Sequence, residues 1–171
     1  MYDLEGIMKI RSLEESDGES FLELLLKLDK ESEFMLYEPA ERATTVQEMA
    51  EKIKSVNNSG GVIIGAIEGE MLLGFVSLSR GQANRIRHSG YVVIGVLQEA
   101  SGKGIGARLL GSLDSWATKH EISKLELTVM THNHRAYQLY LRNNYEVEGT
   151  KKRSVLVNGK FYDEYYMGKI L

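Results

Sequence analysis

A glycine-rich turn between an apolar strand and a leucine-rich helix is the feature that most constrains the fold of this chain. Gly102, Gly104 and Gly106 alternate within VLQEASGKGIGARLL, residues 96–110. Residues 85–96 before the turn are rich in β-branched residues, which predicts a strand, and residues 123–129 predict another. A helix is indicated between them by apolar residues at helical spacing: Ile105, Leu109, Leu113, Trp116 and Ala117. This βαβ unit requires parallel strands and a right-handed crossover.

The segments on either side of the βαβ unit predict antiparallel hairpins. Two apolar runs over 60–68 and 71–79 meet at Glu68-Gly69-Glu70, and strands over 146–157 and 161–171 meet at Asn158-Gly159. A further strand is expected over 7–13, and helices are expected within 15–32, 44–56 and 133–144. The sequence therefore predicts an α+β fold with a mixed, mostly antiparallel seven-stranded sheet, one parallel crossover and about four helices.

Two of these helices have apolar stripes, and the N-terminal end of the first can be predicted. Ser16 or Asp17 is the expected N-cap of the first helix. The stripes expected to face the core are Phe21, Leu22, Leu25, Leu26 and Asp29 in the first helix, and Val46, Met49, Ala50 and Ile53 in the second.

Composition narrows the class of protein. A chain of 171 residues with 43% hydrophobic and 26% charged residues predicts one globular domain over 1–171. There is no cysteine, which excludes disulfides, thiolate metal sites and a cysteine nucleophile. No apolar run approaches about 18 residues, and the N-terminus is too acidic for a signal peptide, so we expect a cytoplasmic protein without a membrane partner. A net charge of −3 argues against broad nucleic-acid binding.

The glycine turn, residues 101–107, has several interpretations when it is taken alone. It satisfies the dinucleotide pattern G-x-G-x-x-G/A, with Glu126 about 20 residues on as a candidate ribose ligand. Antiparallel hairpins precede the unit, however, and too few residues follow for the second half of a parallel sheet. A Walker A loop is excluded because its G-x-x-x-x-G-K-[ST] pattern is missing. A tight turn without a ligand is a third interpretation, although three glycines cost more backbone entropy than a plain turn needs.

Two motifs that follow one another along the chain favour a different interpretation, because both resemble motifs of one known family. VLQEASGKGIGARLLGSLDSWA resembles the acyl-CoA-binding motif of the GNAT superfamily of N-acyltransferases, in which [R/Q]-x-x-G-x-[G/A] joins a strand to a helix. NHRAYQLYLRNNYEVEGT, about 30 residues downstream, resembles the second GNAT signature, N-x-x-A-x-x-L-Y-x-x-x-G-F. The predicted order of strands and helices also matches the family over nearly the whole chain.

The resemblance implies acetyl-CoA as the donor and no metal. The pyrophosphate would bind the backbone N–H groups at the start of the helix, where the helix dipole is positive. The strand ending at Val96 would pair with the pantetheine arm, and Tyr140 would assist departure of the CoA thiolate. The cofactor-binding residues implied in this way are Ile94, Val96, Ser101, Gly102, Lys103, Gly104, Ile105, Gly106, Ala107, Asn133 and Tyr140. Asn133 and Tyr140 also share one helical face, and Asn133 is equally suited to be the N-cap.

The chain departs from the family pattern at three places. Ser101 stands where Arg or Gln is usual, which predicts weaker pyrophosphate binding. Asn144-Tyr145 replaces Gly-Phe, and Asn tolerates the left-handed backbone that Gly would adopt. Tyr91 occupies the strand position where many relatives have a glutamate base, so the candidates for deprotonating the amine are Glu38, His88 and Tyr91.

The sequence thus predicts an N-acetyltransferase acting on a primary amine by direct attack, with Tyr140 as the catalytic residue and Glu38 and Tyr91 as substrate-binding residues. A GNAT-fold protein that binds acyl-CoA as a sensor without catalysis is the alternative. The acceptor is expected between residues 33–45 and the C-terminal hairpin, whose aromatic run leaves one face to a substrate or to the partner of a homodimer. The sequence does not distinguish a small-molecule amine from a protein amine as the acceptor.

Two other features suggest chemistry less specifically. His132 and His134 lie two residues apart without an acidic or cysteine partner, so no metal site is expected. Lys151–Ser154, KKRS, indicates a solvated strand edge rather than a nucleic-acid patch.

Overall fold

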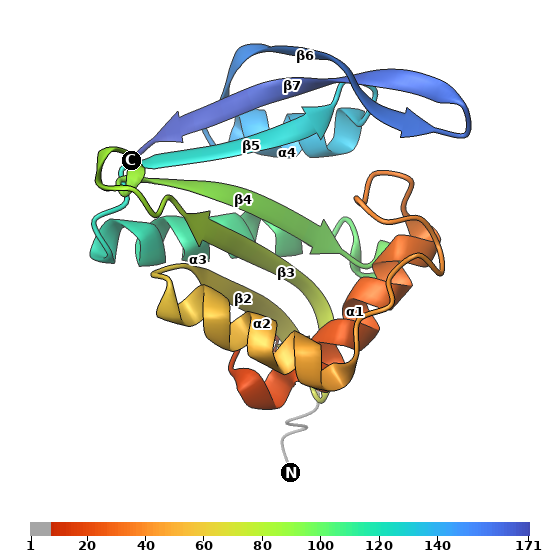
Figure 1. The fold of residues 1–171 in the computed structure, drawn as a ribbon, viewed down its shortest axis with the longest axis vertical. Helices are drawn as coiled ribbons and strands as arrows, with labels where there is room; N and C mark the ends of the chain where they lie inside the picture. The colour runs from red at the N-terminus through yellow and green to blue at the C-terminus, as the bar shows by residue number, and fades with distance from the viewer. Residues whose placement is uncertain (1–7) are drawn as a thin grey trace.

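The computed structural model describes residues 8–171, which form a seven-stranded sheet in the order β1-β2-β3-β4-β5-β7-β6 (Figure 1). The strands are β1 (Lys9–Ser12), β2 (Val62–Glu68), β3 (Met71–Arg80), β4 (Ser89–Val96), β5 (Lys124–Met130), β6 (Glu146–Val157) and β7 (Lys160–Ile170). The α-helices are α1 (Gly18–Glu31), α2 (Val46–Asn58), α3 (Ile105–Lys119) and α4 (His134–Arg142). Ile7, the expected first residue of the first strand, lies outside the described residues.

The topology confirms the predicted fold class. Every neighbouring pair of strands is antiparallel except β4 and β5, which α3 connects as a parallel crossover. The predicted hairpins are present: Glu68 pairs with Met71, and Val157 pairs with Lys160. The second turn has φ values of 50° at Asn158 and 76° at Gly159, the left-handed backbone that a two-residue hairpin turn requires.

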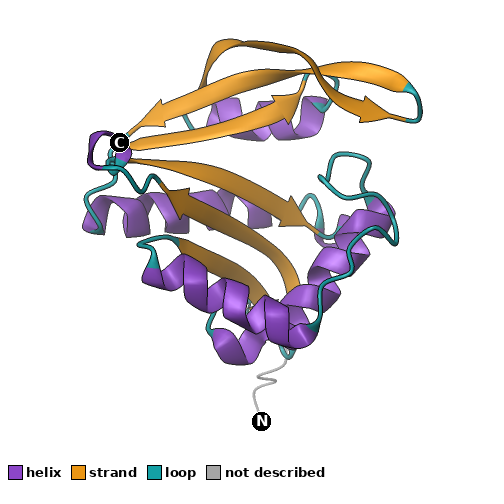
Figure 2. Ribbon diagram, in the orientation of Figure 1, coloured by secondary structure: helices purple, strands orange, loops and turns teal. Residues whose placement is uncertain are grey.

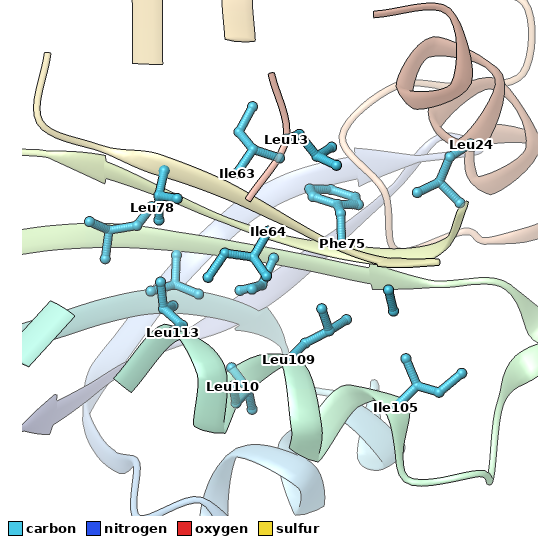
Figure 3. Close-up of a cluster of buried hydrophobic side chains, with 14 of the residues drawn as sticks. Leu13, Leu24, Ile63, Ile64, Phe75, Leu78, Ile105, Leu109, Leu110 and Leu113 are labelled. Carbon is cyan, nitrogen blue, oxygen red and sulfur yellow. The ribbon is translucent and has the colours of Figure 1, made fainter. Parts of the chain in front are cut away.

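The helices cover both faces of the sheet, and the core therefore has two layers. α1 packs on β3 and α2 packs on β2, whereas α3 contacts the first four strands. Figure 3 shows Ile105, Leu109, Leu110 and Leu113 of α3 on one side of the strands and Leu13, Leu24 and Ile63 on the other. The buried residues of α3 include four of the five that its periodicity predicts, and Trp116 is half-buried against them.

Some local predictions need correction. Val46 is the first residue of α2 and is 46% exposed, because Thr45 caps the helix and the stripe that reaches the core begins one turn later at Met49. Residues 85–88 are not part of a strand: a 3-10 turn occupies Asn84–Ile86, and β4 begins at Ser89. Asp17 occupies the N-cap position of α1, but its carboxylate binds Arg11 and the N–H of Glu14 instead of capping α1.

β6 forms the outer edge of the sheet and is part of the long hairpin in Figure 2. Lys151–Ser154 lie on this edge, where the pairing with β7 is interrupted between Lys151 and Val155 and Arg153 has a φ of 49°. The three basic side chains are exposed, which confirms the solvated strand edge. Within residues 8–171, no helix has the length and apolar character needed to cross a membrane.

Candidate active site

β4 and β5 pair over a short length and then diverge. Their register consists of Ser89 with Lys124, Gly90 with Leu125 and Tyr91 with Glu126, and no pair follows in the described structure. Figure 1 shows the two strands together at their N-terminal ends and apart at their C-terminal ends. We call the unpaired part, residues 92–96 of β4 and 127–130 of β5, the β4–β5 divergence. It leaves backbone hydrogen-bonding groups of β4 without a strand partner on that side.

The register with β3 identifies which backbone groups of β4 are left free. Leu97 donates its N–H to the carbonyl of Leu73 at 2.9 Å, and Gly95 pairs with Phe75 two residues earlier. Because backbone groups alternate in direction along a strand, those of Leu97 and Gly95 point to β3, and those of Ile94 and Val96 point into the divergence. The two residues implied to bind the pantetheine arm therefore have free backbone groups at the required side of the strand.

The glycine turn presents a row of unpaired donors. The backbone N–H groups of residues 102–107 have no acceptor among the described residues, and the first helical bond of α3 runs from the N–H of Arg108 to the carbonyl of Gly104 at 3.1 Å. Gly102 and Gly104 have φ values of 79° and 76°, which turn these N–H groups outward at little steric cost. Free N–H groups at the positive end of a 15-residue helix suit the pyrophosphate of CoA.

Gly106 has a different role from the other two glycines. A Cβ atom on it would lie 2.9 Å from a methyl group of Leu139. The first turn of α3 can therefore approach α4 closely, and this contact places α4, which carries Tyr140, beside the glycine turn.

The position where the motif has Arg or Gln carries no charge in this chain, because Ser101 occupies it. Ser101 is half-buried, and its hydroxyl donates to the carbonyl of Leu97 at 3.1 Å. Lys103 is exposed and forms no ion pair with a described residue. Ile105 is buried below the turn, whereas Ala107 is exposed beside it. The polar groups that the turn itself presents are therefore mainly backbone N–H groups.

Tyr140 lies on the inner face of α4 and is 6% exposed. Its ring centroid is 5.8 Å from that of Tyr145, and its hydroxyl makes no hydrogen bond to a described residue. Burial raises the pKa of the Tyr140 phenol, and the nearby Tyr91 phenol raises it further. The hydroxyl therefore stays protonated and able to donate a hydrogen bond.

Asn133 and Tyr91, the other polar candidates near the predicted site, each form a side-chain hydrogen bond. The Asn133 side chain accepts from the N–H of Ala136 at 3.2 Å, so it caps α4. Tyr91 lies at the last β4–β5 pair, is 44% exposed, and shares a 2.7 Å hydrogen bond with the hydroxyl of Thr128 on β5. The point where the strands separate thus carries a bonded pair of hydroxyls.

The other candidate bases lie elsewhere. Glu38 is exposed in the loop between α1 and α2, and its backbone N–H donates to a Glu41 carboxylate oxygen at 2.8 Å. His88 is exposed just before β4, at the paired end of the strand and away from the divergence. Neither side chain is brought to Tyr140 by a described contact.

His132 joins three segments that sequence reasoning did not connect. Its ring stacks on Tyr162 of β7 at 4.3 Å between centroids and lies 5.1 Å from that of Phe34, in the loop after α1. Its Nε2 is 3.9 Å from a Glu33 carboxylate oxygen. The loop after α1 and the C-terminal hairpin, the two segments expected around the acceptor, are therefore linked through this ring. No group of three or more potential metal ligands occurs among residues 8–171.

Sequence reasoning also missed two side chains close to the predicted site. Thr128 is the hydroxyl partner of Tyr91. Arg135, in the first turn of α4, has a guanidinium nitrogen 3.8 Å from where a Cβ of Gly102 would lie. Both contacts join segments distant in sequence, and only the tertiary arrangement reveals them.

The described structure thus combines a mixed sheet that opens between β4 and β5, a turn with unpaired backbone N–H groups, and a buried tyrosine on α4. The model of the acetyltransferase (GNAT) family matches residues 22–145, and the chain belongs to that family. It is therefore an acetyltransferase with acetyl-CoA as its donor, which confirms the enzyme class and the cofactor expected from the sequence. The unpaired N–H groups of residues 102–107 and the free edge of β4 fit this donor.

Individual relatives agree with this assignment. The L-amino acid N-acetyltransferase AaaT of Escherichia coli (strain K12) is 28% identical over 112 residues, which are 63% of this chain and 67% of that protein. An acetyltransferase of the GNAT family from Streptococcus pneumoniae is 28% identical, with a TM-score of 0.93 over 96% of this chain and 100% of its own. A phosphinothricin acetyltransferase from Sinorhizobium meliloti, solved with acetyl-CoA, shares the fold at 20% identity, with a TM-score of 0.84 over 96% of this chain and 88% of its own.

Proposed function

We propose that the protein transfers the acetyl group of acetyl-CoA to the α-amino group of an amino acid or peptide. This proposal is carried by the β4–β5 divergence, which leaves the N–H groups of Ile94 and Val96 free. The largely buried Tyr140 on α4 has a hydroxyl without a hydrogen-bond partner among the described residues. The glycine turn lies at the end of the same strand, so one extended donor molecule can reach all three features.

In this mechanism the chain acts by positioning and hydrogen bonding. The free N–H groups of residues 102–107 hold the pyrophosphate, and the backbone of β4 aligns the pantetheine arm as an added strand. The N–H of Val96 stabilises negative charge on the thioester carbonyl oxygen. The amine nitrogen forms the bond to the acetyl carbon while the C–S bond breaks, one proton leaves nitrogen, and one is taken up by sulfur.

Tyr140 assists the leaving sulfur as a hydrogen-bond donor. A thiol has a pKa near 8.5 and a phenol near 10, so complete proton transfer to the thiolate is uphill by roughly 2 kcal/mol in water. The raised pKa of the buried Tyr140 makes early transfer still less favourable. A hydrogen bond to the developing thiolate remains favourable throughout, because the phenol keeps its proton.

The residue types at the divergence support the α-amine of a peptide N-terminus, rather than a lysine side chain, as the acceptor. A lysine amine, with a pKa near 10.4, is neutral in roughly one molecule in 2500 at pH 7, whereas a peptide α-amine near 7.7–8.0 is neutral in about one in ten. Tyr91 occupies the β4 position at which many relatives carry a glutamate base, and a weakly basic site suits the amine that needs less help. The relative from Escherichia coli is named for L-amino acids.

An amine panel tests this proposal. CoA release would be measured with free L-amino acids, peptides with a free N-terminus, N-blocked lysine peptides and polyamines, and products would be identified by mass spectrometry. We expect turnover with α-amines, and Tyr140→Phe should lower kcat by about 10²-fold or more while leaving CoA binding unchanged. Turnover confined to lysine peptides or polyamines would contradict the α-amine proposal.

A second candidate is a non-catalytic acyl-CoA sensor. Ser101 in place of Arg or Gln, and Tyr91 in place of a glutamate base, favour it. CoA binding without acetyl transfer to any amine in the panel would favour the sensor over the α-amine transferase.

A further inference from the structure

The geometry points to Arg135 as the cation that holds the CoA pyrophosphate, in place of the side chain that the family motif normally provides at the position of Ser101. This inference rests on the proposed function, since it assumes that CoA binds at the glycine turn. It assigns a role to a residue of α4 that lies outside both the turn and the strand before it.

The position of Arg135 is the first support. One of its guanidinium nitrogens lies 3.8 Å from where a Cβ of Gly102 would be, so the side chain crosses from the first turn of α4 to the mouth of the glycine turn. The N–H groups of residues 102–107 are unpaired next to it. A planar guanidinium beside a row of backbone donors can form two parallel hydrogen bonds to a phosphate.

Arg135 has no competing partner in the described part of the chain. Arg11 and Arg42, by contrast, form bidentate pairs with Asp17 and Asp29. No carboxylate among residues 8–171 lies within ion-pair distance of Arg135, and the side chain is exposed. Its charge is therefore available to an anionic ligand without first breaking a salt bridge.

The other cations near the turn lie on its opposite side. Lys103 and Arg108 line a cavity of about 170 Å³ together with Glu68, at the end of the β2–β3 hairpin. Glu68 brings an acidic side chain to the lining of this same cavity. Ser101 cannot replace them, because its hydroxyl is bonded to the carbonyl of Leu97. Arg135 is thus the cation on the α4 side of the turn, where Tyr140 also lies.

Direct binding of CoA tests the assignment without any acceptor. Isothermal titration would compare wild type with Arg135→Gln, which keeps much of the side-chain length but loses the charge. The matched control is Arg142→Gln, which removes an exposed arginine from the last turn of the same helix. We expect Arg135→Gln to weaken CoA binding about tenfold or more and Arg142→Gln to leave it unchanged. Thermal unfolding of both variants would establish that they are folded.

Two further titrations show which phosphate Arg135 binds and whether its positive charge is what matters. Dephospho-CoA keeps the pyrophosphate but lacks the 3′-phosphate, so the loss in Arg135→Gln should be equally large with it. Adding Ser101→Arg to Arg135→Gln should restore most of the affinity, since it returns a cation to the same anion from the motif position.

The outcomes are distinct. If wild type binds CoA and Arg135→Gln binds it equally well, or loses no more than Arg142→Gln does, the inference is wrong and the proposed function stands. A loss that disappears with dephospho-CoA would assign Arg135 to the 3′-phosphate and overturn the pyrophosphate role. If wild type does not bind CoA at all, the proposed function itself fails.

Discussion

The Tyr140 phenol combines deep burial with a free hydroxyl, and this combination determines how its pH dependence should look. Burial and the neighbouring Tyr91 raise its pKa above the ordinary value of about 10. A raised pKa means that the protonated, donating form persists to higher pH than usual. The rate should therefore rise as the acceptor amine loses its proton and then level off, with no fall caused by Tyr140 up to about pH 10.

A pH profile of kcat and kcat/KM between pH 6 and 10 checks this expectation. The same profile for Tyr140→Phe should keep its shape at a lower rate, because the missing hydroxyl does not titrate in this range. A descending limb below about pH 9.5 that is present in wild type and absent from the variant would contradict it.

The Tyr91–Thr128 hydroxyl pair is a second residue-scale feature with a testable consequence. The 2.7 Å bond fixes the Tyr91 ring at the point where β4 and β5 separate. If Tyr91 meets the acceptor in this fixed position, Thr128→Val should raise KM for the acceptor several-fold while the CoA affinity stays the same. Thr128→Ser keeps the hydroxyl and serves as the control.

A double-mutant cycle with Tyr91→Phe separates this role from simple packing. The two substitutions should then be non-additive, since either one already removes the bond. Additive effects on KM would show that the two hydroxyls act independently.

At the scale of single elements, the start of α3 depends on a backbone conformation that only glycine adopts cheaply. Gly104 has a φ of 76°, and no atom lies within 4 Å of a Cβ built on it. Gly104→Ala therefore introduces strain without a clash and should cost about 1–2 kcal/mol. Gly111, exposed in the middle of the same helix with equally open space, provides the matched control.

Gly111→Ala should stabilise the protein by about 0.4–1 kcal/mol, because it restricts the unfolded chain and fits the helical backbone. Urea unfolding of both variants measures the difference directly. Equal effects of the two substitutions would mean that the left-handed conformation at Gly104 is not required in the folded state.

The junction between α1 and the following loop contains a buried ion pair. Arg42 donates to the two carboxylate oxygens of Asp29 at 2.7 and 3.1 Å, and Asp29 is 2% exposed. Arg42→Met leaves a buried carboxylate without a partner and should lower the free energy of unfolding by about 3–5 kcal/mol. The double variant Asp29→Leu, Arg42→Met should recover most of this loss, because no unpaired charge remains. Urea unfolding that gives equal stability to the single and double variants would contradict this account.

The sequence predicted the properties that depend on residues close together in the chain, and it did not predict contacts between distant segments. Periodicity identified the buried face of α3, and turn chemistry identified three of the left-handed residues: Asn158 and Gly159 in the hairpin, and Asn144, whose φ is 65°. These properties depend on neighbouring residues. Turn chemistry did not identify Ala40, Glu121 or Arg153, which also have a positive φ. Asp29 was expected on a buried stripe, but its partner in the next loop was not.

The arrangement of the candidate site was predictable only in part for the same reason. The glycine turn, Tyr140 and Asn133 were identified from motifs within single elements. The hydroxyl pair, the ring of His132 between two distant segments, and Arg135 over Gly102 arise where separate elements meet. Spacing along one chain segment carries no information on such contacts.

At the scale of the whole molecule, the sheet consists of two parts joined at a narrow place. β1 to β4 form one continuous run of paired strands and β5, β7 and β6 form another, whereas β4 and β5 share only three residue pairs. A ligand in the divergence would touch both parts. With CoA at about 100 times its Kd, the folded state should gain about 2.7 kcal/mol. For a chain of this size that corresponds to a rise in Tm of roughly 5–10 °C.

Hydrogen exchange would show whether this stabilisation comes from strand addition at β4. The amide of Gly95 faces β3 and is expected to be protected before any ligand binds, whereas those of Ile94 and Val96 face the divergence. Addition of CoA should therefore slow exchange at the two outward-facing amides and change Gly95 little. Residue-resolved exchange by NMR measures this alternation. A uniform slowing along β4 would instead indicate that CoA tightens the whole sheet without pairing with the strand, and the free edge of β4 would lose its proposed role.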